Sequence, residues 1–201
     1  MQKQPFGAGA ARAAMLVALA CAALPAHAVL EYDEYLERAQ KARQRGDWQD
    51  VAVNVAEAIN HPDRPRKPGE WSDLNLDYGR AMGVLCQFNE AQMFLQRGLD
   101  IAQRGQASTA RALYELGSLA AAEQKHALAA MHLTALLHAP AKADLAQLSA
   151  LQWADARRKL AASLTALGKA EDAARWLGDG ASSSPAGSAG ITPYGTRCTA
   201  R

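Results

Sequence analysis

The sequence predicts an all-α fold, a helical-repeat solenoid of about four antiparallel helix pairs over residues 29–180. A short turn pattern recurs along the chain with spacings of 40, 38 and 44 residues. A small residue stands seven positions before each turn, where it would let a neighbouring helix approach closely. Alanine is abundant and aromatic residues make up only 6% of the chain, as is typical of closely packed helices. Together these features predict stacked helix pairs that share one continuous core.

The four predicted units align on their turns. The turns begin at Gly46, Cys86, Gln124 and Gly168. The small residues before them are Ala39, Gly79, Gly117 and Ala161, and the apolar residues after them are Val55, Leu95, Leu133 and Leu177. These offsets are helical and keep the residues on one face. Each unit is therefore predicted to be a helix, a short turn and a second helix.

The chain begins with features of a secretory signal peptide over residues 1–28. Lys3 and Arg12 precede an apolar run over residues 13–24, and Ala26-His27-Ala28 forms an A-x-A cleavage site. The run is shorter than the ~20 residues that a membrane-spanning helix needs. We expect cleavage near Ala28 and a periplasmic or secreted mature chain without a membrane span. A lipoprotein acylated at Cys21 is the alternative.

The helices are predicted in chain order from periodicity and end signals. They cover residues 31–45, 47–60, 71–86, 88–104, 107–123, 125–138, 143–167 and 169–178. Three prolines place residues 60–69 in a loop, and Ser72 is the candidate N-cap of the helix that follows. The helix at 143–167 is longer than its counterparts, so its first half is a candidate extra element. Residues 181–201 are rich in Ser, Gly and Pro and are predicted to be a mostly disordered tail.

The repeat pattern resembles the tetratricopeptide repeat (TPR) family, whose signature is W-x2-L-G-x2-Y…A-x3-F…P. Leu116-Gly117, Ala129 and Leu133 match it best, followed by Tyr78-Gly79, Ala91 and Leu95. The resemblance covers roughly residues 31–178. No unit has the closing proline in place, and the spacings exceed the 34-residue period of the family.

The resemblance implies that the first helix of each pair lines a groove for a peptide or a partner's helix. Carried over along the four first helices, the groove positions are Asp33, Leu36, Gln40 and Arg43; Asp73, Leu76, Arg80 and Gly83; Arg111, Tyr114, Ser118 and Ala121; and Asp155, Arg158, Ala162 and Thr165. The candidate partner-binding residues are Leu36, Gln40, Arg43, Leu76, Arg80, Tyr114, Ser118 and Arg158. The Lys and Asn residues of the family's carboxylate clamp are missing. A partly apolar ligand with some acidic character fits this set. Alternatively, Leu36, Leu76 and Tyr114 complete the core between helices.

No catalytic or metal-binding motif is present, so the sequence predicts neither an enzyme nor a cofactor. His126, His132 and His138 stand six residues apart, and adjacent members of the series do not share a helix face as metal ligands would. His126 aligns with Trp48 and Phe88, which indicates a packing role. Basic and acidic residues number 22 and 20 in the whole chain, and Lys3 and Arg12 belong to the leader. The mature chain therefore has no basic excess for nucleic acid.

Two cysteines, Cys86 and Cys198, lie beyond the leader. After export a disulfide between them would persist and would pin the tail across the stack. The alternative is a half-buried thiol at Cys86 and a free thiol in the tail. The sequence does not supply the Cα separation that distinguishes them.

The leading functional hypothesis is a non-catalytic periplasmic scaffold or adaptor that binds a partner protein or peptide of the cell envelope. A second is a structural component of an envelope assembly that self-associates through end residues such as Trp176 and Leu177. An envelope hydrolase on a helical scaffold is the weakest, because no acid–base pair stands out.

Overall fold

The computed structural model describes residues 30–138, 140–177, 191–195 and 198, and within them the chain is all α-helical. The helices are α1 (Tyr32–Arg45), α2 (Trp48–Asn60), α3 (Pro68–Val84), α4 (Phe88–Arg104), α5 (Ala110–Ala122), α6 (His126–Leu137), α7 (Lys142–Leu145), α8 (Ala150–Ala166) and α9 (Ala170–Leu177). The predicted all-α class is confirmed. The predicted signal peptide lies outside the described residues.

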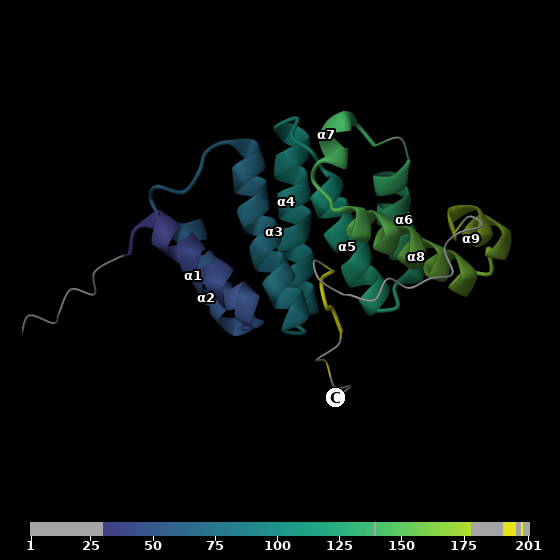
Figure 1. The fold of residues 1–201 in the computed structure, drawn as a ribbon, viewed down its shortest axis with the longest axis horizontal. Helices are drawn as coiled ribbons and strands as arrows, with labels where there is room; N and C mark the ends of the chain where they lie inside the picture. Colours follow the sequence, from purple (N-terminus) through teal and green to yellow (C-terminus); the bar gives the residue numbers. More distant parts are fainter. Residues whose placement is uncertain (1–29, 139, 178–190, 196–197, 199–201) are drawn as a thin grey trace, which may run out of the picture.

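The helices form a stack of neighbouring pairs that extends from α1 to α9 (Figure 1). Within pairs, α1 packs on α2, α3 on α4, α5 on α6 and α8 on α9. Between pairs, α2 packs on α3, α4 on α5 and α6 on α8. First helices also touch one another, α3 with α5 and α5 with α8. This pattern is that of a helical-repeat fold, in which each unit contacts mainly its neighbours.

The four predicted turns share one backbone conformation. Gly46, Cys86, Gln124 and Gly168 have φ angles of 70°, 67°, 59° and 76°. A left-handed residue directly after a helix redirects the chain and ends the helix. Glycine adopts this conformation freely, whereas a side chain at Cys86 or Gln124 costs roughly 1–2 kcal/mol. The repeat in the sequence therefore marks the end of each first helix.

The small residues before these turns allow close contact within the pairs. A Cβ on Gly79 would lie 2.8 Å from Cγ of Leu95 on α4. A Cβ on Gly117 would lie 2.6 Å from Cγ of Leu133 on α6. Both leucines are fully buried. These glycines therefore set the spacing of the two central pairs.

The third helix begins earlier than its sequence indicates. It starts at Pro68. Proline suits the first helical position because a backbone N–H at that position would have no acceptor within the helix. Ser72, the predicted N-cap, lies inside α3, is buried, and donates a 2.8 Å hydrogen bond from Oγ to the carbonyl oxygen of Gly98. The N-cap prediction is wrong because Ser72 joins α3 to α4 instead.

The long helix predicted over residues 143–167 is interrupted. The short helix α7 ends at Leu145, and α8 begins at Ala150. Ser149 caps α8 by accepting a hydrogen bond from the backbone N–H of Gln152, whose side chain in turn accepts from the backbone N–H of Ser149. This capping box starts α8 afresh, so α7 is the extra element.

Two apolar cores run through the stack. The first is built by α1 to α5, and the second by α5, α6, α8 and α9. Tyr194, from the predicted tail, is buried within the first core. Within the predicted tail, residues 191–195 are thus placed against the helices, with Thr192 and Tyr194 both buried. Among the described helices, none combines the length and the apolar character needed to cross a membrane.

Candidate partner-binding face

The candidate face is the side of the stack to which α1, α3, α5 and α8 contribute their predicted groove positions; we call it the first-helix face. Gln40 on α1 is exposed, and Leu36 is half-buried against the first core. The side chains of Arg43, Arg80 and Arg158 are 32%, 14% and 30% exposed. These five residues reach the surface to different degrees.

The other three candidates belong to the packing between helices. Leu76, Tyr114 and Ser118 are all at most 2% exposed. Leu76 fills the space left by Gly98, where a Cβ would lie 2.6 Å from its Cδ2. Tyr114 and Ser118 lie where α5 meets α8. The expectation that these three line an open groove is corrected, because α4 and α8 cover them.

An ion-pair chain links the first helices at one part of the face. Arg43 of α1 places Nη2 3.0 Å from Oδ1 of Asp77 on α3. Arg111 of α5 contacts the same Asp77 oxygen and also donates to Oδ1 of Asp73 at 2.9 Å. Because Asp77 accepts from both sides, it holds three successive first helices together. Arg43 and Arg111 are thus already neutralised, which leaves less positive charge for an acidic ligand.

The environment of Asp77 lowers its pKa. Burial alone would raise the pKa of this carboxyl, but the charges of Arg111 and Arg43 and their hydrogen bonds outweigh burial. The ordinary pKa of an aspartate is 3.8, and a carboxylate whose pKa is lower in the folded state stabilises the fold at pH values above 3.8. The stabilisation is lost as the pH falls through the lowered pKa.

Asp77→Asn is expected to reduce the free energy of unfolding near neutral pH by about 1.5–3 kcal/mol, since charged hydrogen bonds to two arginines weaken. The free energy of unfolding of the variant should also decrease less steeply than that of the wild type between about pH 5 and pH 2. Urea denaturation over a pH series measures both effects. Asp63→Asn is the control, because Asp63 is 76% exposed. An acid-induced loss as steep in Asp77→Asn as in the wild type would contradict this role.

A second polar cluster joins α5 to α8. Tyr114 donates a 2.8 Å hydrogen bond from its hydroxyl to Oδ2 of Asp155. Lys159 contacts the same oxygen and donates to Oγ of Ser118 at 3.0 Å. Arg158 lies 3.4 Å from the other oxygen of Asp155. Burial and the charge of Asp155 raise the pKa of Tyr114, so its hydroxyl remains a donor. The cluster is satisfied internally.

A third cluster surrounds Glu115 of α5, whose side chain is only 1% exposed. Thr192 donates from Oγ1 to both carboxylate oxygens, at 3.0 and 2.9 Å. Tyr194 donates from its hydroxyl to Oε2 at 2.7 Å. Nε of Arg80 lies 3.8 Å from Oε1. A buried carboxylate is costly without such partners, so the tail supplies donors that Glu115 requires.

The remaining contacts of this cluster fix Arg80 and Tyr194. The Arg80 guanidinium lies over the Trp48 ring at 5.4 Å, and within the described structure its Nε is buried without a hydrogen-bond acceptor. Burial and the charge of Glu115 raise the pKa of Tyr194 well above its ordinary value. The phenol therefore stays protonated and donates at neutral pH.

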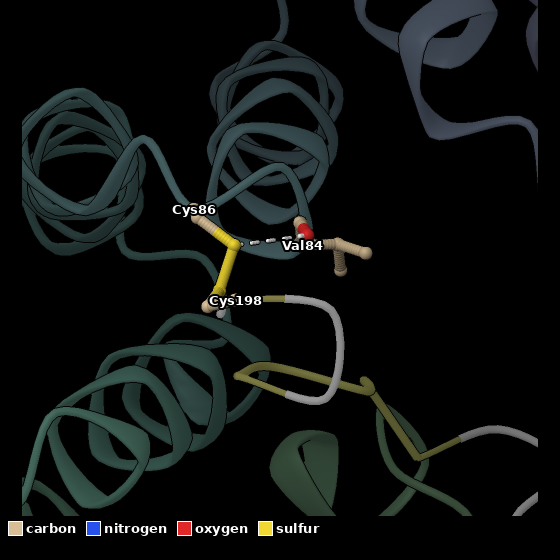
Figure 2. Close-up of a disulfide and its surroundings, with 3 residues drawn as sticks. All are labelled: Val84, Cys86 and Cys198. Carbon is tan, nitrogen blue, oxygen red and sulfur yellow. Dashed lines mark hydrogen bonds between the residues drawn. A yellow bond between two sulfur atoms is a disulfide. The ribbon is translucent and has the colours of Figure 1, made fainter. Parts of the chain in front are cut away.

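Cys86 and Cys198 are joined by a disulfide with a Cα separation of 5.7 Å. Figure 2 shows the bond connecting the turn after α3 with the C-terminal segment. Of the two alternatives for these cysteines, the structure contains the bridged one. The bond holds the segment next to the first-helix face.

Glu115, Thr192 and Tyr194 were not predicted from the sequence. An acidic residue inside the apolar pattern of α5 was one available signal. Another was the pair formed by Tyr194 and Cys198, an aromatic residue and a cysteine in a tail otherwise poor in both.

In the part of the chain that the structure describes, no three His, Cys, Asp or Glu side chains are grouped to hold a metal ion. His132 is buried, and burial lowers its pKa.

No protein-family model matches this sequence, and a search of curated proteins finds no match.

Proposed function

We propose that this protein is a non-catalytic, TPR-like scaffold or adaptor of the periplasm that binds a segment of an envelope protein on its first-helix face. The fold supports this proposal through the succession of its first helices, because α3 contacts α5, α5 contacts α8, and Asp77 of α3 pairs with Arg43 of α1 and Arg111 of α5. Helical-repeat proteins commonly use such extended surfaces for partner binding.

The observation that carries the proposal is the position of residues 191–195. In this non-helical segment the Tyr194 ring lies against Gly83, a predicted groove position on α3, and Thr192 and Tyr194 bond Glu115 on α5. Its side chains enter a pocket whose walls are first-helix residues. A surface that accommodates a peptide of its own chain has the shape and the hydrogen-bonding groups to accommodate a similar peptide from another chain.

Site-specific photo-crosslinking tests the proposal. A photoreactive residue replaces exposed Gln40 on α1, and a control places it at exposed Met93 on α4. In envelope extract that contains a dithiol reductant we expect a defined crosslinked partner from position 40 and none from position 93. Equal crosslinking from both positions would contradict binding on the first-helix face.

Self-association through the last pair remains a second proposal, supported by Leu167 and Leu177, which are 40% and 39% exposed. Trp176, by contrast, packs partly buried against the second core of its own chain. Light scattering over a concentration series distinguishes the two proposals. A molar mass that stays monomeric at all concentrations would exclude self-association.

A further inference from the structure

Residues 191–195 bind the first-helix face as a ligand would. Thr192 and Tyr194 are 4% and 8% exposed although they belong to a segment without helical structure. The backbone N–H of Tyr194 donates to the carbonyl oxygen of Thr192 at 2.9 Å. This tight turn at Pro193 brings both hydroxyls to one carboxylate, that of Glu115.

The pocket is also shaped for the tyrosine ring. A Cβ on Gly83 of α3 would lie 2.4 Å from Cε1 of Tyr194, so the ring occupies the space that the glycine leaves. Leu119 of α5 borders the same space, at 3.0 Å from that Cβ position. The pocket thus combines an aromatic slot with a buried anionic acceptor. A peptide with a Thr-x-Tyr arrangement satisfies both.

The segment is held in place by a bond that can be broken chemically. Cys86 lies two residues beyond the end of α3, so the disulfide to Cys198 keeps the tail within reach of the pocket. Cys86 and Cys198 are both partly exposed. The bond is therefore accessible to a small thiol.

Building on the proposed function, we propose that residues 191–195 are a tethered internal ligand that occupies the partner site. A dithiol reductant opens the site, which then takes a partner segment with Thr and Tyr hydroxyls two residues apart. One thiolate of the reductant attacks a protein sulfur, breaks the Cys86–Cys198 bond and forms a mixed disulfide. Its second thiol displaces the protein sulfur and forms the reductant's own disulfide. Two electrons pass to the protein, leaving two cysteine thiols.

Peptide binding to the full chain tests the specificity of the pocket. The probe is a labelled peptide with the sequence of residues 190–196, GITPYGT. An open variant combines Cys198→Ser with Thr192→Val and Tyr194→Phe, so that its own tail cannot supply the hydroxyls. Fluorescence anisotropy should show binding to the open variant at least about tenfold tighter than to the oxidised wild type, because the tethered tail competes at high effective concentration.

Two controls identify the groups that bind. The peptide GIVPFGT lacks both hydroxyls and should bind the open variant at least about tenfold more weakly, since it loses hydrogen bonds to a charged acceptor. Adding Glu115→Gln to the open variant keeps an acceptor oxygen but removes the charge, and should weaken GITPYGT several-fold. Equal binding of both peptides, or binding to the oxidised wild type as tight as to the open variant, would overturn the proposal.

Hydrogen exchange on the wild type tests the redox step without any substitution. Treatment with dithiothreitol should increase deuterium uptake in residues 191–195 while α3 and α5 keep their protection. Unchanged uptake in residues 191–195 after complete reduction would overturn opening by reduction. Peptide binding and hydrogen exchange are both measured on the purified chain, without an envelope partner. Failure of this inference can therefore be distinguished from failure of the proposed function, which is tested by crosslinking at position 40.

Discussion

Replacing Cys198 with serine is expected to lower the free energy of unfolding by about 2–5 kcal/mol. The disulfide joins residues separated by 112 positions, so it closes a loop that contains most of the fold. Cross-linking such a long loop restricts the unfolded chain, and this restriction accounts for much of the stabilisation. Urea denaturation of oxidised wild type and variant, monitored by circular dichroism, measures the difference.

A matched pair of variants separates the disulfide from the backbone at Cys86. Both carry Cys198→Ser, and one has Cys86→Ser while the other has Cys86→Gly. Because residue 86 has a φ angle of 67°, the glycine variant should be more stable by up to about 1 kcal/mol. If removal of the bond left stability unchanged, the bond would contribute nothing to the fold.

Leu133→Ala is expected to lower the free energy of unfolding by about 2–5 kcal/mol. The leucine is fully buried at the contact between α5 and α6, and α6 is also covered by α8. Truncation leaves a cavity that two rigid neighbouring helices cannot close. Thermal and urea unfolding of this variant and the wild type provide the test.

A double-mutant cycle with Gly117→Ala shows whether Leu133 and Gly117 act as one contact. Alone, Gly117→Ala should cost about 1–3 kcal/mol, since its Cβ would lie 2.6 Å from Cγ of Leu133. In the Leu133→Ala background the same change should cost little. Gly69→Ala is the control, because the nearest tertiary contact of its Cβ position is Cβ of Ala107, at 3.9 Å. Additive effects of the two substitutions would refute the close contact.

The class of fold and the positions of the turns could be predicted from the sequence because both depend on local periodicity. Gly79 and Gly117 recur before their turns in the primary structure, and their contacts with Leu95 and Leu133 follow from helical geometry. Element boundaries were less predictable. Pro68 begins α3 and Ser149 begins α8 because capping groups and the packing of neighbours compete with the periodic pattern.

The distinction between groove and core could not be made from the sequence. Leu36, Leu76 and Tyr114 hold equivalent positions in their units, yet Leu36 is half-buried and the other two are fully covered. The difference arises from their place in the stack. Among the described helices α1 packs directly on α2 alone, whereas α3 and α5 also pack on helices of neighbouring pairs.

The sequence by itself determined the repeat, the helix pairs and the left-handed turns, because these depend on residues a few positions apart. Only the tertiary structure decided that the tail returns to the first-helix face. Glu115 and Tyr194 are separated by 79 positions, and no local pattern connects them. Their contact exists because a carboxylate buried among helices requires hydrogen-bond donors, and the folded chain brings two hydroxyls to it.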